Sequence, residues 1–301
     1  MRNTISNRIY ASAVSHLVTK ACGFAYRDFP PVVRIETTNA CNSSCVMCPH
    51  GQMTRPIGIM DQNLYEKIVR ECADNRVKTL HLHNFGEPLI DKRLPERIAF
   101  AKKLGIRKVK FFTNASLLNK EKAEALLDAG ADEIKISVDG GSKETFEAIR
   151  VSLNYDTVAA NIAGLVECRN KRGLRKPVVK LNFVVREDNK HEMKSFAEKW
   201  RRIADSISFD EEHNWSVQGM FDKEKEVLHA CLRIWNTFTV LWDGRVALCC
   251  LDYDGKEILG DLHDQSIKEI WTNNRLSQIR KYHITRNFSG IPLCKTCSKI
   301  R

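Results

Sequence analysis

Short β-rich runs alternate with stretches of helical periodicity between residues 32 and 211. This alternation is typical of βα units, in which a helix returns the chain so that successive strands pair in parallel. It predicts an α/β fold, a partial (βα)6 TIM barrel with three quarters of the usual eight strands. The predicted strands are Val32–Thr38, Thr79–Gly86, Lys108–Asn114, Glu133–Gly140, Val178–Val185 and Ser206–Glu211.

Helical patterns lie between these strands, at 61–74, 94–104, 119–129, 156–172 and 190–203. Asp61, Asn119 and Asp156 are the expected N-caps, because their side-chain oxygens can accept from the free N–H groups of a first turn. Gly105 and Gly130 are expected to end two helices. In such barrels ligands bind at the carboxyl ends of the strands, so the chemistry should lie there.

Three cysteines, Cys41, Cys45 and Cys48, follow the first predicted strand. Thiolates are soft ligands that select iron–sulfur clusters, zinc or Cu(I), and three of them leave a fourth metal position open to a small molecule. The alternative is a structural zinc closed by His50, which would need paired ligands from two separate knuckles.

A second set of cysteines lies beyond residue 213, where the βα rhythm stops. Asp243-Gly244, between two β-rich runs, predicts a hairpin turn that brings the middle cysteines toward the others. A [4Fe–4S] cluster needs four thiolates, one fewer than this region offers. Because successive strand side chains point to opposite faces, adjacent cysteines should not bind the same iron. The set is Cys231, Cys249, Cys250, Cys294 and Cys297.

Length and composition limit what surrounds these sites. With 301 residues, 43% hydrophobic and 28% charged, the chain can form one large and one small domain. We expect an N-terminal extension at 1–30, the partial barrel at 31–212 and a cluster-binding domain at 213–301. No apolar run reaches membrane-span length and no clear signal region opens the sequence. Eleven cysteines then indicate metal or redox chemistry in the cytoplasm, where thiols stay reduced.

The formal net charge of +11 is compatible with nucleic acid, an anionic small substrate or an acidic electron donor. Lys and Arg are spread along the predicted helices, and the short basic runs at 107–110 and 170–176 form no nucleic-acid-binding arm. We favour a flavodoxin or ferredoxin steered to a basic face, and nucleic acid is the least favoured partner.

The C-x3-C-x2-C spacing of Cys41, Cys45 and Cys48 resembles the cluster motif of the radical S-adenosylmethionine (SAM) enzymes. The resemblance implies a catalytic [4Fe–4S] cluster whose fourth iron binds the amino and carboxylate groups of SAM. One electron from it would cleave SAM to methionine and a 5′-deoxyadenosyl radical, which abstracts hydrogen from substrate; the cofactor carries the hard step. The family fold is also a partial barrel.

Phe85-Gly86-Glu87-Pro88 looks like the family's GGEP motif, with Phe85 in place of the first glycine. In the relatives this motif holds the amino group of SAM, and a Ser and Arg pair contacts the ribose and the carboxylate. A planar guanidinium suits carboxylate recognition. Asn114 offers a polar group for the ribose, and Val184 is a candidate adenine contact that core packing would explain equally well. The candidate cofactor-binding residues are thus Gly86, Glu87, Asn114, Ser137, Arg150 and Val184.

The spacing Cys231-x12-Gly244-x4-Cys249, followed by Cys294-x2-Cys297, resembles the SPASM or twitch type of auxiliary-cluster domain. The resemblance implies one auxiliary [4Fe–4S] cluster, since two would need more cysteines, and counts Cys249 as the ligand. The neighbouring Cys250 leaves that choice open. The spare thiol is either a buried structural residue or a catalytic hydrogen-atom donor.

The presence of such a donor separates two reactions. A dehydrogenase passes a second electron to the auxiliary cluster, whereas an epimerase returns a hydrogen from a thiol. Similarity to aminoglycoside dehydrogenase and epimerase-type enzymes favours oxidation or epimerisation of a carbohydrate- or aminocyclitol-like substrate. Only some thirty residues precede the first strand, too few for a peptide-recognition domain. Radical modification of a peptide or protein is the alternative, and a structural zinc protein that binds nucleic acid is the alternative from another class.

Polar residues on the barrel strands and just beyond them are candidates for binding the substrate. His81 and His83 share one face of the second strand, and we interpret them as satisfied core histidines rather than ligands. The full set is His81, His83, Asn182, Asp210, Glu211, Glu212 and Trp215.

Overall fold

The computed structural model describes residues 27–215 and 230–298, so most of the predicted N-terminal extension lies outside the described residues. The chain divides into two compact units. We call residues 33–212 with 240–244 the barrel unit, and 1–32, 213–239 and 245–301 the C-terminal unit. The predicted domain boundaries stay a prediction.

The barrel unit is built on strands in the order β6-β5-β4-β3-β2-β1, and β2 to β6 pair in parallel. The predicted partial barrel is therefore confirmed. Strands β5 and β6 have the predicted bounds, whereas β1 to β4 end earlier than expected because polar loop residues follow. The bounds are β1 Val32–Ile35, β2 Thr79–His81, β3 Lys108–Thr113, β4 Glu133–Ser137, β5 Val178–Val185 and β6 Ser206–Glu211.

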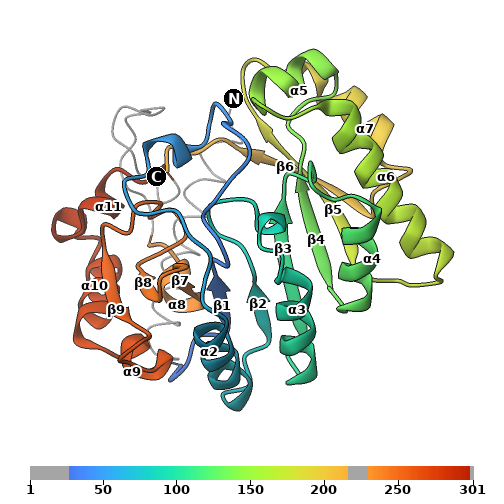
Figure 1. Ribbon diagram of the computed structural model, residues 1–301. Coiled ribbons are helices and arrows are strands. Elements are labelled where there is room, and N and C mark those ends of the chain that lie inside the picture. The colour runs from blue at the N-terminus through green and yellow to red at the C-terminus, as the bar shows by residue number, and fades with distance from the viewer. Residues whose placement is uncertain (1–26, 216–229, 299–301) are drawn as a thin grey trace. The chain divides into compact units, whose positions relative to one another are not determined.

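Helices follow the strands, and α2, α3 and α4 lie along the same side of the sheet (Figure 1). The helix α5 was not expected from the sequence, because its seven residues are too few for a clear periodic pattern. The helices are α2 Gln62–Asp74, α3 Leu94–Lys103, α4 Lys120–Asp128, α5 Lys143–Ile149, α6 Tyr155–Lys171 and α7 Met193–Trp200, with short 3-10 turns η1 Pro49–Gln52, η2 Pro88–Ile90 and η3 Lys190–Glu192.

Two of the three predicted N-caps are confirmed. Asp61 accepts from two backbone N–H groups of α2, and Asn119 accepts from the backbone of α4. The third prediction, Asp156, is wrong: Asn154 caps α6 by accepting from Thr157 N, so the helix begins two residues earlier. Both side chains can cap, and the backbone position of the turn decides between them.

The two faces of the barrel sheet differ in polarity. The face toward the helices is apolar, and residues such as Leu80, Phe111 and Ile134 are fully buried there. The opposite face, which we call the inner face, carries the alternate residues of each strand, among them Lys110 and Lys135, and these are partly exposed.

The elements beyond residue 230 are shorter, and the turn at 241–244 belongs to the barrel unit. Gly244 has φ of 87° and its N–H donates to Leu241 O, which confirms the predicted turn between β7 and β8. Strands β8 and β9 are antiparallel. The bounds are α8 Arg233–Asn236, β7 Thr237–Val240, β8 Arg245–Ala247, β9 Ile258–Asp261, α9 Ile267–Trp271, α10 Asn274–Thr285, η4 Phe288–Gly290 and α11 Pro292–Lys295.

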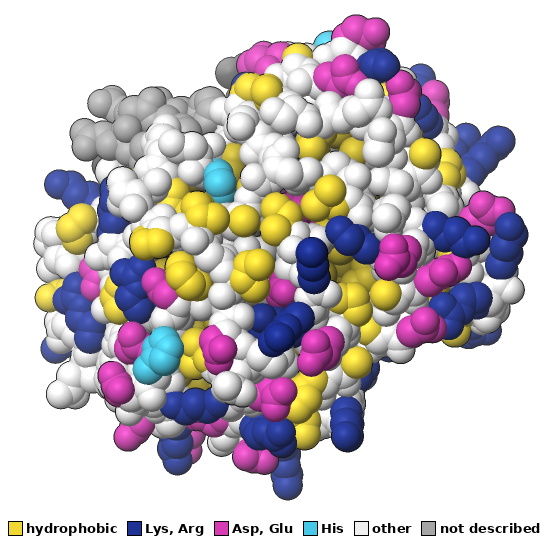
Figure 2. All heavy atoms as spheres, in the orientation of Figure 1, with side chains coloured by type: hydrophobic (Ala, Val, Ile, Leu, Met, Phe, Trp, Pro, Cys, Tyr) yellow, Lys and Arg dark blue, Asp and Glu magenta, His cyan; other side chains and the backbone are white. Residues whose placement is uncertain are grey.

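Lys and Arg side chains are interspersed with Asp and Glu on the face of the molecule shown in Figure 2, rather than gathered in one patch. This mixture gives the displayed face no footprint for nucleic acid. Within the described residues, no helix has the length and apolar character that crossing a membrane requires.

Candidate cluster and cofactor sites

The first three cysteines lie in a loop, residues 39–48, that follows β1 and is held from two sides. The buried side chain of Asn39 donates to Pro56 O at 2.8 Å and accepts from Gly58 N at 2.8 Å. The backbone of Ser44 donates to Val151 O, and that of Val46 to Ile149 O, each at 3.1 Å. The loop is thus fixed by neighbouring segments before any metal binds.

Burial disfavours the charged form of these thiols. It raises the pKa of Cys41 to about 11 and that of Cys48 to about 12, with the nearby sulfurs adding to the effect. A metal cluster would supply the positive charge that such thiolates need. Arg150 also contributes, because its Nη1 donates to Cys45 Sγ at 3.4 Å.

The arrangement fits a multi-iron cluster better than one zinc ion. Zinc ligands converge on a single ion at about 2.0–2.3 Å, and the described residues contain no His, Cys, Asp or Glu group compact enough to hold a single metal ion. The Nε2 of His50 lies 2.7 Å from Asn39 O, so this ring is engaged with the loop backbone. Thiolates that bind separate irons are farther apart, which suits a cubane with one open iron.

Gly86, at the start of the GGEP-like segment, approaches this loop closely. Its φ is +86°, and a Cβ there would lie 2.7 Å from Ala40 O. The next residue, Glu87, donates its N–H to the same oxygen at 2.7 Å. Phe85 is 3% exposed and packs in the core, so replacing the family's first glycine leaves the approach unobstructed.

The carboxylate of Glu87 joins the ends of β2 and β3. Burial raises its pKa, while hydrogen bonds from Asn114 N, Thr113 Oγ1 and Leu89 N oppose the rise. Oε1 accepts from Thr113 at 2.6 Å and from Leu89 at 3.1 Å, and Oε2 accepts from Asn114 N at 2.7 Å. Since a carboxylate oxygen can accept two bonds, Oε2 retains capacity for a ligand amino group.

Asn114 takes part in a side-chain network that the sequence did not predict. Its Nδ2 donates to Asn42 Oδ1 at 3.0 Å, Asn42 donates to Ser116 Oγ at 2.8 Å, and Ser116 Oγ donates back to Asn114 Oδ1 at 2.7 Å. The network ties the cysteine loop to the end of β3. The sequence gives no indication of this role for Asn42 other than its position between two of the cysteines.

Arg150 forms an ion pair with the fully buried carboxylate of Asp139. Burial alone would lower the pKa of Arg150, but Asp139 and Cys45 raise it overall. Asp139 Oδ1 accepts from Val184 N at 2.6 Å, so Val184 contributes its backbone here. The ion pair was missed, although an acid at the end of the fourth strand and an Arg downstream were visible. Ser137 ends β4 with a half-buried side chain.

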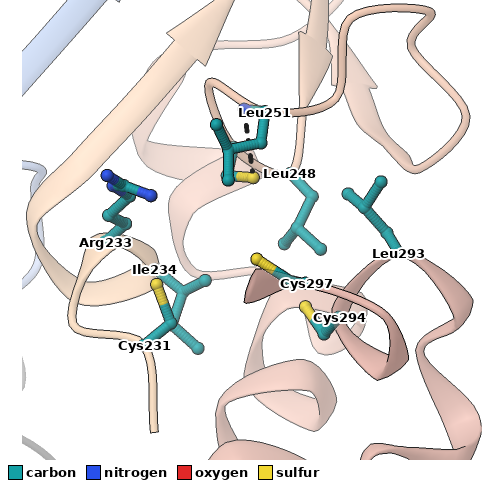
Figure 3. A pocket seen from close by; sticks show the side chains of 9 residues that line it. Cys231, Arg233, Ile234, Leu248, Leu251, Leu293, Cys294 and Cys297 are labelled. Carbon is teal, nitrogen blue, oxygen red and sulfur yellow. Dashed lines mark hydrogen bonds between the residues drawn. The ribbon is translucent and has the colours of Figure 1, made fainter. Parts of the chain in front are cut away.

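The C-terminal unit contains a partly open cavity. Four cysteines line it, and the labelled sulfurs of Cys231, Cys294 and Cys297 point into it (Figure 3). The fourth is Cys249, whose Sγ accepts from Leu251 N at 3.4 Å. Cys250 is not among the lining residues. The walls are completed by Arg233, Ile234, Leu248, Leu251 and Leu293.

The cavity suits a polynuclear cluster through its donors, which are four cysteine sulfurs. Burial raises the pKa of Cys231, Cys249 and Cys294, and cationic iron would favour their thiolates. The pKa of Arg233, which burial alone would lower, is raised by Cys250 and the other thiols, so the guanidinium lies among them.

Comparison with known proteins agrees with both sites. Residues 35–199 match the Radical SAM superfamily, and residues 231–298 match SPASM, an iron–sulfur cluster-binding domain. A probable GTP 3′,8-cyclase of Metallosphaera sedula is 32% identical over 65% of this chain and 62% of its own length. A SAM-dependent 2-deoxy-scyllo-inosamine dehydrogenase of Niallia circulans is 22% identical over 89% of this chain and 93% of its own length. For the cyclase, then, the chain spans less than two thirds of the relative.

Two solved structures show the same fold. BtrN in complex with AdoMet and 2-DOIA has a TM-score of 0.62 at 18% identity, covering 89% of this chain and 93% of that one. SuiB of Streptococcus suis bound to the precursor peptide SuiA has a TM-score of 0.68 at 15% identity, covering 96% and 74%. The iron–sulfur domain match removes the zinc alternative. Since the superfamily match covers more than half of the 301 residues, the chain is a SAM- and [4Fe–4S]-dependent enzyme and belongs to the radical SAM superfamily.

Proposed function

We propose that the protein oxidises a carbohydrate- or aminocyclitol-like small molecule at a carbinol carbon. The observation that carries this proposal is the cavity with four cysteines in the C-terminal unit. Four thiolates complete the ligand set of a cubane and leave no iron for substrate. A fully ligated cluster suits electron transfer, which is what removal of the second electron of an oxidation requires.

The barrel unit would provide the other half of the reaction. We propose Cys41, Cys45 and Cys48 as ligands of the catalytic cluster. When bound, that cluster and SAM supply a 5′-deoxyadenosyl radical for hydrogen abstraction. Cofactor binding is proposed for Gly86, Glu87, Asn114, Ser137, Arg150 and Val184. Glu87 would accept from the amino group through Oε2, and the fixed cysteine loop would keep that oxygen in place.

The relatives named above differ in how strongly they support a small-molecule substrate. The inosamine dehydrogenase aligns along nearly all of both chains, which favours an aminocyclitol-like substrate. The cyclase aligns with only part of its length, so its nucleotide chemistry is the weaker guide. The likeness to SuiB concerns the fold, and modification of a peptide is therefore the less favoured alternative.

Epimerisation is the second candidate, and Cys250 is the observation that favours it. This half-buried thiol is not among the residues that line the cavity, so it is free to act as a hydrogen-atom donor if Cys249 binds the cluster. For the electron donor, we propose an acidic flavodoxin or ferredoxin, on the basis of the net charge of +11.

Anaerobic reconstitution tests the proposal. Two cubanes predict about eight irons per chain. With dithionite and SAM the protein should release 5′-deoxyadenosine, and with an aminocyclitol panel it should form a ketone without incorporating deuterium from heavy water. Deuterium in a recovered alcohol, lost in Cys250→Ala, would show epimerisation instead. Absence of 5′-deoxyadenosine under all these conditions would refute the proposed chemistry.

A further inference from the structure

A connected row of cationic and aromatic side chains lies on the inner face of the barrel sheet. Arg34 Nη1 lies 3.4 Å from His83 Nε2. The His83 ring stacks on Phe112 with centroids 4.2 Å apart, and Lys135 Nζ lies 5.0 Å from the centroid of the same Phe112 ring. Lys135 Nζ also pairs with Asp210 at 3.1 Å. Strands β1, β3 and β4 and the segment just after β2 thus contribute to one surface, and β6 adds Asp210 at its edge.

Positive charge exceeds negative charge on this face. Glu133 is shared by Lys108 at 2.7 Å, Lys180 at 3.1 Å and Lys110 at 3.5 Å. Asp210 forms an ion pair with Lys135, and the Asp210 side chain is 52% exposed to solvent. Among the described residues Arg34 forms no ion pair, and the buried Glu36, which directly follows β1, is paired with Arg55 at 2.6 Å. The surplus positive charge therefore comes from Arg34 and from the three lysines that share the single carboxylate of Glu133.

Two polar atoms in the row lack a hydrogen-bond partner among the described residues. They are Nδ1 of His83, a residue that is only 4% exposed, and Nε of Arg34. Burial and the charge of Arg34 hold the pKa of His83 well below its usual range, so the ring is neutral at pH 7 and adds no charge. Buried donors that the fold leaves unmatched mark a place where a ligand can complete the bonding.

The row lies directly below the proposed SAM site. Along the same strands, Phe112 and Lys135 come two residues before Asn114 and Ser137. At about 3.3 Å per residue, the row is about 7 Å deeper in the barrel than those candidates. A substrate bound there would lie within reach of a radical formed at the strand ends.

We propose that Arg34 and Lys135 bind an anionic group of the substrate, a phosphate or a carboxylate, which narrows the proposed carbohydrate- or aminocyclitol-like class to its acidic members. The proposal rests on the small-molecule function proposed above. Arg34 lies beside the His83 ring and Lys135 over the Phe112 ring that stacks on it, and a guanidinium and an ammonium are the side-chain groups that pair with a planar or tetrahedral anion. Asn182 and Ser208, whose side chains are joined at 2.9 Å at the next level of the inner face, would accept or donate to hydroxyls.

The test uses the anaerobically reconstituted full chain and titration calorimetry with inorganic phosphate and with acetate. We expect both anions to bind, and Arg34→Gln and Lys135→Gln each to weaken phosphate binding about tenfold, the loss of one charge-assisted contact. Asp210→Asn should tighten phosphate binding several-fold, since it removes the carboxylate that competes for Lys135. If neither anion binds, or if these three variants leave binding unchanged, the inference is wrong.

Further variants separate charge from folding. Lys135→Arg retains the charge and should retain phosphate binding, whereas Lys171→Gln, on α6 with a side chain 74% exposed, is the matched control and should have no effect. Glucose 6-phosphate, glucuronate and glucose then identify the source of the anion: tighter binding of the first indicates phosphate, and of the second carboxylate. Preference for glucose over both would count against an acidic substrate.

Release of 5′-deoxyadenosine, measured on the same preparation, keeps the two proposals apart. Anion binding without release would remove the proposed function and leave the anion site. Release of 5′-deoxyadenosine without anion binding would leave the proposed function and remove the anion site.

Discussion

The two thiol sites use their surroundings in different ways. In the barrel unit, three cysteines share one loop, and the strand ends supply the rest of the site through Glu87, Asn114 and Arg150. In the C-terminal unit, four cysteines from three segments of the chain line one cavity with largely apolar walls. An incomplete ligand set with polar neighbours suits a cluster that binds a reactant, and a complete set with apolar neighbours suits one that only transfers electrons.

Loss of a thiol in the barrel unit should have the largest effect. Cys48→Ala should lose about four irons per chain and reduce 5′-deoxyadenosine release below detection, because the cluster keeps too few ligands. Iron analysis and chromatography of the nucleoside measure both. Cys168→Ala, a half-buried cysteine of α6, is the control. Normal nucleoside release by Cys48→Ala would show that the cysteines of the barrel unit do not hold the cluster that cleaves SAM.

Loss of a thiol in the C-terminal unit should separate SAM cleavage from turnover. Cys249→Ala should also lose about four irons and stop ketone formation, yet still release 5′-deoxyadenosine. Cys250→Ala should keep its iron, because that side chain is not among those lining the cavity. The iron content of the two variants shows which of the two cysteines is a ligand of the auxiliary cluster. If Cys250→Ala loses iron and Cys249→Ala does not, the ligand assignment must be exchanged.

Loss of the ion pair between Arg150 and Asp139, next to the first site, should have a smaller effect, and that effect is on the stability of the fold. Arg150→Gln would leave Asp139, which is fully buried, without its cationic partner. Removing one member of a buried ion pair costs about 3–5 kcal/mol, which urea unfolding would measure. The double variant Arg150→Gln with Asp139→Asn should recover part of that loss. Equal stability of Arg150→Gln and the unsubstituted protein would show that the pair contributes nothing.

Gly86 provides the smallest and most local test. Gly86→Ala combines a positive φ with a Cβ 2.7 Å from Ala40 O, whereas Gly173→Ala has φ of +64° and nothing within 4 Å of its Cβ. Gly173→Ala should cost about 1–2 kcal/mol from backbone strain alone, and Gly86→Ala should cost more and weaken SAM binding. Unfolding and equilibrium dialysis measure the two quantities. Equal costs would mean that the close approach at Gly86 is unimportant.

Local patterns predicted the fold well because strand alternation and turn residues act over short distances. Strands β5 and β6 have the predicted bounds, and the cysteine spacings pointed to both sites. The strand-alternation argument about Cys249 and Cys250 does not apply, because β8 ends at Ala247 and both cysteines lie in the turn beyond it. The cavity lining, which includes Cys249 and not Cys250, is what distinguishes them.

Pairings across strands were not predictable in the same way. The contacts of Asp139 with Arg150 and of Asn42 with Asn114 depend on which strand ends become neighbours. The interpretation of His83 as a satisfied core residue was right about burial but wrong about satisfaction, because its Nδ1 has no partner among the described residues. Only the folded sheet places Arg34 beside that ring.

The most direct test of the account asks whether the first cluster, held by Cys41, Cys45 and Cys48, binds SAM through iron. A Cys294→Ala and Cys297→Ala double variant isolates that cluster, and its reduced form is examined by electron–nuclear double resonance with SAM labelled with ¹⁵N at the amino group. We predict a ¹⁵N coupling that disappears when unlabelled SAM is substituted. A reduced cluster with no ¹⁵N coupling at saturating SAM would contradict the account.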